Sequence, residues 1–310
     1  MDARKILGFA VLALGVGLGG CGDDGNGDGD GDAGTGNGGG ATPLPEQLSK
    51  GEGGDAVYTC EPSAPPTGDS RTFTLAVEDF ETGAPVPDVC VNFYGDNQVP
   101  VSDTCGGTTT DASGEIEVTD PDGSYYAYRI FEEAGTNVGV VQRNEEAPDE
   151  GGTAVGNSVS ASTAGLIPGV LGVQQDPEDA IFAGTVVDCD GDVVEGAGMR
   201  VVRNGEIIPE GTGSTDARYE YFDGEEFPMQ GRDSTNTDGL FIGVNIPIES
   251  QGEEVLAIAC GKVDGTPELI GCEETRSFAN TVNIINLGPV REDGPEGCAA
   301  AASLCAEAFE

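Results

Sequence analysis

Short runs of alternating apolar and polar residues limit the fold of this chain more than any other feature. Turn sequences such as ETGAP (81–85), DASG (111–114) and DPDG (120–123) separate these runs. Because successive side chains of a strand point to opposite faces, alternation places the apolar set on one buried face. Strands this short, at this spacing, predict an all-β chain built of antiparallel sandwiches. The residues expected to face inward are Phe73, Leu75, Val77, Val89, Val91, Phe93, Ile116, Val118, Tyr126, Tyr128 and Ile130.

The pattern occurs twice along the chain. DFETGAPVPDV (79–89) and DCDGDVVEGAG (188–198) share an aspartate that ends a strand, then a glycine, then a valine three residues later. Downstream, TDASGEI (110–116) corresponds loosely to TDGLF (237–241). Tight turns with positive φ are expected at the shared glycines. These are Gly83, Gly114, Gly191 and Gly239, and the second copy carries about 17 more residues between its pair than the first.

This arrangement resembles the carboxypeptidase regulatory-like family, whose members are transthyretin-like (prealbumin-like) β-sandwiches, similar to immunoglobulin-like domains. The resemblance covers residues 70–131 and 181–260. It implies two modules with an accessory or structural role rather than a catalytic one.

The chain is therefore expected to divide into six segments. Ser160 or Ser162 is the expected cap of a connector helix, with Pro168 near its first turn. The segments are a signal peptide (1–20), a lipidated cysteine with a disordered Gly/Asp tether (21–56), β-sandwich domain 1 (57–156), a helical connector (157–179), β-sandwich domain 2 (180–291) and a C-terminal helical tail (292–310).

The N-terminus has the pattern of an export signal. Arg4 and Lys5 precede thirteen apolar residues (6–18), a length that suits a signal peptide and is too short to span a bilayer. The sequence LGGC that ends at Cys21 resembles the lipobox of bacterial lipoproteins. This resemblance implies cleavage before Cys21, a diacylglyceryl group on its thiol and, usually, an acylated amino terminus. The other interpretation is ordinary cleavage that leaves Cys21 free or disulfide-bonded.

Two or more acyl chains hold a protein firmly on a membrane. The expected location is therefore the cell envelope, with the membrane contacted through the lipid on Cys21. Gly22 rather than an aspartate follows Cys21, which by analogy favours the outer membrane of a Gram-negative bacterium.

The other eight cysteines form an even set, which in an exported chain predicts a disulfide framework. Cys90 and Cys105 flank a short polar excursion and are natural partners, whereas Cys260 is expected to join Cys189 or Cys272. On one continuous helix the last two cysteines would lie about 10 Å apart, beyond disulfide reach, so each would clamp the tail onto the body. If they pair with each other, the helix is broken. The eight are Cys60, Cys90, Cys105, Cys189, Cys260, Cys272, Cys298 and Cys305.

The tether contains half of a calcium-binding pattern. Asp24, Asn26 and Asp28 match the start of an EF-hand loop, but Thr35 stands where the loop requires glutamate. A solvated acidic tether is therefore favoured over a calcium site.

Charge and the missing histidines narrow the function. The chain has 13 basic and 56 acidic residues, a net charge of −43, which argues against nucleic acid and anionic membrane as direct ligands. Without histidine, Ser-His-Asp and Cys-His systems and HExxH zinc sites are not available. No cofactor and no metal site is expected.

The expected function is therefore a non-catalytic, structural or adhesive (binding) role in the cell envelope, with an envelope protein or a polysaccharide as partner. One alternative is a carbohydrate-binding module. Another is a hydrolase that uses carboxylates, which would need carboxylates of raised pKa converging in a cleft.

The insertion in domain 2 supplies the candidate contact loop, ARYEYFDGEEFPMQGRD (217–233). Its aromatic residues, with nearby arginines, are of the kind that stacks on a sugar or on a partner's side chain. The competing interpretation is that Tyr219 and Tyr221 share one face of a strand and pack in the core. The candidate contact residues are Tyr219, Tyr221, Phe222 and Phe227.

Overall fold

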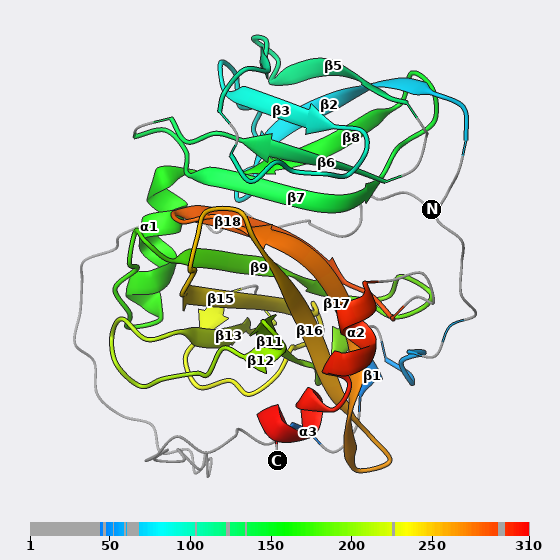
Figure 1. Cartoon of the computed structure of the whole chain (residues 1–310), viewed down its shortest axis with the longest axis vertical. Helices are drawn as coiled ribbons and strands as arrows, with labels where there is room; N and C mark the ends of the chain where they lie inside the picture. Colours follow the sequence, from blue (N-terminus) through cyan, green and yellow to red (C-terminus); the bar gives the residue numbers. More distant parts are fainter. Residues whose placement is uncertain are drawn as a thin grey trace, which may run out of the picture.

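The computed structural model of the chain describes residues 44–309, apart from 46–47, 52, 59, 61–67, 103, 122–124, 134, 225–226 and 291–294. This described part is built mostly of strands, with three short helices, which confirms the expected all-β class. Figure 1 shows domain 1 at one end of the long axis and domain 2 at the other. The predicted signal peptide, the lipidated Cys21 and the half EF-hand pattern lie outside the described residues.

Domain 1 is a sandwich of two layers. One layer has the strand order β5-β2-β8, and the other has the order β4-β3-β6-β7. The alternating residues predicted to face inward form its core, where Phe73, Leu75 and Val77 of one layer meet Tyr128 and Ile130 of the other. The strands are β2 (Arg71–Asp79), β3 (Cys90–Tyr94), β4 (Thr108–Thr109), β5 (Glu115–Asp120), β6 (Tyr125–Ile130), β7 (Gly139–Glu146) and β8 (Thr153–Ser158).

Domain 2 repeats this plan, with a layer β12-β11-β16-β17 facing a layer β14-β13-β15-β9-β18. Phe182, Tyr221 and Phe241 are among the residues buried between the two layers. The insertion supplies β13 and β14, which extend the second layer at its edge. The strands are β9 (Ala180–Val186), β10 (Val194–Glu195), β11 (Gly198–Arg203), β12 (Glu206–Ile207), β13 (Arg218–Phe222), β14 (Pro228–Met229), β15 (Leu240–Ile246), β16 (Glu253–Val263), β17 (Thr266–Ser277) and β18 (Thr281–Leu287).

Equivalent glycine turns close both copies of the repeat. The Val77 N–H donates to the carbonyl of Gly114 at 2.8 Å, and the Val186 N–H donates to that of Gly239 at 2.9 Å. The left-handed conformation at these turns is the one that glycine adopts without steric cost. The φ angles are 65° at Gly83, 77° at Gly114, 80° at Gly191 and 64° at Gly239.

A buried threonine fixes the register of the repeat. The hydroxyl of Thr110 donates to the carbonyl of Val86 at 2.8 Å and accepts from the N–H of Val89 at 3.0 Å. In the second copy Thr235 makes the same two bonds, at 2.7 and 2.9 Å. The sequence correspondence that matched Thr110 with Thr237 is therefore wrong by two residues. The identical Thr-Asp dipeptides suggested it, but the hydrogen bonds belong to Thr235.

One nine-stranded sheet joins the two sandwiches, because β7 of domain 1 pairs with β18 of domain 2. The pairing is parallel and runs from Gly139 opposite Thr281 to Gln142 opposite Ile284. Strand β18 is also parallel to β9, and β2 is parallel to β8. The expectation of purely antiparallel, separate sandwiches is corrected in this respect. The shared pairing covers two strand edges that separate domains would leave open.

Helix α1 (Ala161–Val170) connects the domains and lies against the apolar face of the shared sheet, where Ile167 packs. It confirms the predicted cap, because the Ser160 hydroxyl accepts from the N–H of Thr163 at 3.0 Å. Pro168 was expected near the first turn but lies in the last one. Its side chain is buried there, whereas Leu166 is 53% exposed.

The segment that precedes domain 1 is folded onto domain 2, and we call its described residues within 44–60 the strap. Strand β1 (Ser49–Lys50) pairs antiparallel with β10. Leu44 and Leu48 are only 2% and 4% exposed. The predicted disordered tether therefore does not extend to residue 56. Two leucines interrupt its polar composition, and their burial stabilises the docked segment.

The C-terminal tail forms two helices, α2 (Glu296–Ala301) and α3 (Leu304–Phe309), instead of one continuous helix. They cover the outer face of the layer β12-β11-β16-β17, where Phe309 is buried beside Leu44 and Ile258. Among the helices of the described residues, none is long and apolar enough to cross a membrane.

Candidate functional site

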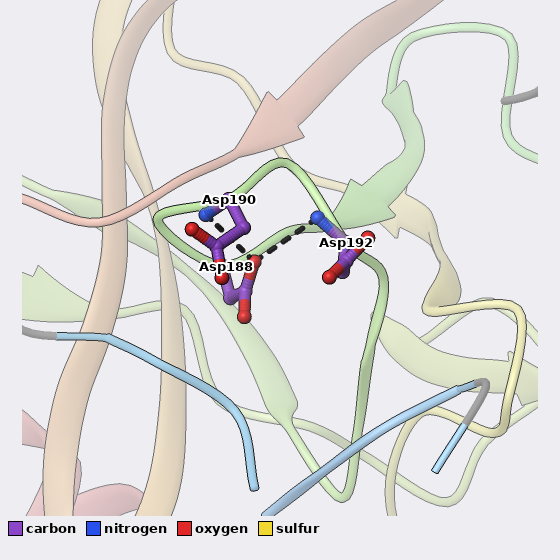
Figure 2. A group of neighbouring side chains, drawn as sticks. All are labelled: Asp188, Asp190 and Asp192. Carbon is purple, nitrogen blue, oxygen red and sulfur yellow. Dashed lines mark hydrogen bonds between the residues drawn. The ribbon is translucent and has the colours of Figure 1, made fainter. Parts of the chain in front are cut away.

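Lys50 of the strap lies in a cluster of charged groups at the turn after β9. Figure 2 shows Asp188, Asp190 and Asp192 converging on this turn, with the N–H groups of Asp190 and Asp192 donating to the carboxylate of Asp188. The ammonium of Lys50 lies 3.2 Å from Asp188 and 2.8 Å from each of the other two. The strap therefore brings its own counter-charge to the cluster.

The three carboxylates offer ligand atoms within 4.8 Å of one another, the kind of group that can hold a metal ion. Lys50 supplies the positive charge at this place. Burial alone would raise the pKa of Asp188, but hydrogen bonds from the Val57 and neighbouring N–H groups and from Lys50 outweigh it and lower that pKa. The pKa of Lys50 is raised mainly by its bonds to Asp190 and Asp192. Both partners stay charged at neutral pH, so the cluster acts as a clasp for the strap.

All eight cysteines beyond Cys21 are paired. Cys90 and Cys105 form the predicted pair. Cys260 bonds to Cys305 and Cys189 bonds to Cys60, so the expected pairing of Cys260 with Cys189 or Cys272 is wrong. The remaining pair is Cys272 with Cys298. The strap and the tail pack on domain 2 and bring these distant cysteines together, as the expectation of a clamped tail required.

The candidate contact loop is largely a core strand. Tyr219, Tyr221 and Phe222 lie in β13 and are 3%, 1% and 6% exposed. The hydroxyl of Tyr219 donates to the Ile208 carbonyl at 2.9 Å, and that of Tyr221 accepts from a backbone N–H. Stacking on a ligand would require the core to open, so the contact interpretation is wrong for these three residues. Phe227 is 49% exposed.

Carboxylates with a raised pKa are scattered over the described residues. Burial is the first cause in each case, and for Glu220 it raises the pKa to about 7. Three cavities among the described residues are each lined by at most one such group. The convergence that a carboxylate hydrolase needs is not seen in them. The groups are Glu145, Asp179, Glu210, Glu220, Asp233 and Asp238.

A polar cleft of about 250 Å³ opens where β7 and β18 diverge. Their pairing ends at Gln142 and Ile284. Beyond that point β7 stays with β6, while β18 stays with β9. The chain then leaves β7 toward β8 in one direction and leaves β18 toward the C-terminal helices in another (Figure 1). The crevice between the strands is therefore a consequence of the topology.

Polar side chains from both domains line this cleft. Arg143 donates to the carbonyls of Asn97 and Glu274, both at 3.2 Å, and thereby ties the domains together. Asn144 donates to Glu273 across the cleft at 2.8 Å. Glu145 accepts a hydrogen bond from Gln142, and burial raises the pKa of Glu145. The cleft thus combines hydrogen-bonding groups with a desolvated carboxyl group.

Sequence comparison finds no match to a protein-family model and none to a curated protein. Solved structures show a distant β-sandwich similarity. The Bacillus anthracis TIE protein is 12% identical with a TM-score of 0.23, and the match covers 72% of this chain and 34% of that one, so this chain spans about a third of its length. The shaft pilin spaA of Lactobacillus rhamnosus GG is 12% identical with a TM-score of 0.20, covering 72% and 98%. BcpA, the major pilin subunit of Bacillus cereus, is 8% identical with a TM-score of 0.23, covering 72% and 100%. Matches at this level carry no argument about function.

Sequence reasoning missed the clasp and the cleft. The spacing of Asp188, Asp190 and Asp192 is visible in the sequence, but Lys50 appeared to belong to a polar tether. Leu44 and Leu48, which precede Lys50 within the strap, were the available signal. The cleft had no local signal, because it depends on pairing between strands about 140 residues apart.

Proposed function

We propose that this chain is a non-catalytic lipoprotein of the bacterial cell envelope, anchored through a lipid on Cys21, with a structural or adhesive role. The pattern of residues 4–21 supports export and lipid attachment. The outer membrane of a Gram-negative bacterium is the proposed location, with the folded body held at the surface by residues 22–43.

The disulfides carry the proposal of a location outside the cytoplasm. Four bonds use all eight cysteines of the described body. Such a framework forms and persists in oxidising compartments. Cys60 and Cys105 are exposed, so their bonds would be open to cytoplasmic reductants.

The shape of the molecule supports a structural role. The shared sheet, the Arg143 bonds and the placement of Arg129 between Phe131 and Phe278 connect the two sandwiches at several points. Several independent contacts of this kind oppose hinge motion between domains. A body of two rigidly connected domains can transmit force from its membrane anchor to a surface that it contacts at its other end.

Metabolic labelling tests the anchor. Cells that express the full chain are grown with radiolabelled palmitate, and membranes are separated by density. The wild-type protein should carry label and sediment with outer membrane, whereas Cys21→Ser should lose both label and membrane attachment. The matched control is the double variant Cys90→Ser/Cys105→Ser, which removes two other cysteines and should keep the label. Labelling of Cys21→Ser would contradict the proposal.

A further inference from the structure

The cleft between β7 and β18 lies at a special place in the topology. Strand β18 is parallel to both β9 and β7, so the carboxyl ends of these three strands point the same way. The chain leaves β7 and β18 for different layers, and this opens the cleft beyond their carboxyl ends. In open α/β sheets, crevices beyond the carboxyl ends of parallel strands are the usual places for ligands, and clefts between domains bind ligands preferentially.

Within the described residues, the carboxylate of Glu145 in this cleft has no positively charged partner. One oxygen of the Glu145 carboxylate accepts from Gln142, and no hydrogen bond is made to the other within the described residues. Arg143, two residues before Glu145 in β7, donates to the carbonyls of Asn97 and Glu274. The negative charge of Asp188 at the edge of the cleft is balanced by Lys50. Among the described residues the Glu145 carboxylate has no cationic partner, and a desolvated carboxylate in this situation favours a ligand that brings a positive charge.

Two further side chains in the cleft indicate which other groups the ligand carries. Asn286 lines the cleft on β18, beyond the last residue paired with β7, and its amide is exposed. An amide of this kind both donates to and accepts from hydroxyl groups. Tyr125 lines the same cleft from β6 and offers an aromatic ring. The volume is below that of sites for drug-sized molecules, so the ligand is small.

We propose that this cleft binds an amino sugar, through a protonated amine at Glu145 and hydroxyl groups at Asn286. The proposal goes beyond the lipid anchor and does not depend on it. It also moves sugar recognition away from the β13 aromatic residues, which are buried in the core, to the junction of the two domains.

Titration followed by NMR tests the site. The full-length protein in detergent micelles, labelled with ¹⁵N, is titrated separately with glucosamine, N-acetylglucosamine and glucose. Glucosamine should shift resonances of 143–146 and 285–290. N-acetylglucosamine lacks the charged amine and glucose has no amine, so both should bind at least about tenfold more weakly, as the loss of a charge-assisted hydrogen bond predicts.

Substitutions test whether the Glu145 carboxylate supplies the negative charge that binds the amine. Glu145→Gln keeps the shape and the bond to Gln142, and should weaken glucosamine binding about tenfold or more. Asn286→Ala should weaken it less. The matched control is Glu117→Gln, an exposed carboxylate on β5 in the other layer of domain 1, which should bind like the wild type. Unchanged far-UV circular dichroism and melting temperature (Tm) show that each variant is folded.

Three results would overturn the proposal. They are the absence of shifts with glucosamine at millimolar concentration, equal binding of glucosamine and N-acetylglucosamine, and undiminished binding by folded Glu145→Gln. None of them bears on palmitate labelling of Cys21, so the proposed lipoprotein function stands or falls separately.

Discussion

The two copies of the repeat share their turns but differ in what covers their outer faces. In domain 1 the outer face of β5-β2-β8 is open, with Glu115, Glu117 and Thr153 exposed. In domain 2 the outer face of β15-β9-β18 carries α1, and the outer face of β12-β11-β16-β17 carries Leu44 of the strap with α2 and α3. The outer face that stays open on β5-β2-β8 of domain 1 is thus covered by α1 on the equivalent strands β15-β9-β18 of domain 2, whereas the strap and the tail attach to the other layer of domain 2.

The cross-links follow this difference. One disulfide, Cys90–Cys105, lies within domain 1, whereas three hold the strap and the tail on domain 2. Short segments bury little area and lose much conformational entropy when they dock, so they gain most from a covalent bond. The repeat is therefore stabilised mainly by its turns and core, whereas the strap and the tail are stabilised by disulfides.

The largest expected effects come from removing the disulfides that hold the strap and the tail. Cys260→Ala/Cys305→Ala opens a loop of 45 residues, and in the chain-entropy model this costs about 4 kcal/mol of unfolding free energy. Cys90→Ala/Cys105→Ala opens a loop of 15 residues and should cost about 3 kcal/mol. Denaturant unfolding under oxidising conditions measures both. If the domain 1 variant loses more than the tail variant, the assignment of disulfides to the added segments fails.

The equivalence of the copies is tested by Thr110→Val and Thr235→Val. Each removes a buried hydroxyl that donates one bond and accepts another, and leaves a backbone N–H without its partner. Each variant should lose about 2 kcal/mol of unfolding free energy. Thr237→Val is the control, because this side chain is exposed and its replacement should change stability by less than about 0.5 kcal/mol. A large loss at Thr237 with none at Thr235 would restore the original sequence correspondence.

Local pattern was enough to predict β2, β3, β5 and β6 of domain 1 and the turns of both copies. One face of β2 is buried, and the apolar residues Phe73, Leu75 and Val77 therefore occupy alternate positions of the sequence, where the pattern can be read directly. The glycines at 83 and 191 mark turns for an equally local reason. Ser160 as a helix cap belongs to the same class of prediction.

Long-range pairing was not predictable in the same way. Nothing near Gly139 indicates that β7 will meet β18, and the cysteine count gives no connectivity. Tyr219 and Tyr221 were ambiguous because aromatic residues suit both a contact loop and a core strand, and only the position of β13 beside β15 decides. The candidate cleft was therefore invisible in the sequence.

The insertion of domain 2 gives a pH-dependent test, because Glu220 in β13 has no counterpart in domain 1. Burial raises the pKa of Glu220 to about 7, with partial compensation from the N–H of Gly231. Between about pH 4.5 and 7 the folded state therefore binds more protons at this group than the unfolded state, and stability falls as the pH rises through this window.

Glu220→Gln removes this ionisation. Its Tm should rise relative to the wild type between pH 5 and pH 8, measured by calorimetry at both values. Glu117→Gln on β5 is the exposed control from domain 1 and should follow the wild type at both. A constant difference in Tm between Glu220→Gln and the wild type would show that the buried carboxyl does not titrate in this range.

The smallest expected effect comes from the turn glycines. At Gly83 and Gly191 an added Cβ would meet nothing within 4 Å, so only the positive φ opposes alanine. Each substitution should cost about 1 kcal/mol. At Gly114 and Gly239 the Cβ would also lie 2.7 and 2.8 Å from a backbone carbonyl oxygen, so the loss there should be clearly larger. Urea unfolding of the four variants should therefore give two matched pairs, Gly83 with Gly191 and Gly114 with Gly239, each with one member from each copy. A pairing by domain instead of by turn would mean that the added segments, and not the repeat, decide how each copy tolerates strain.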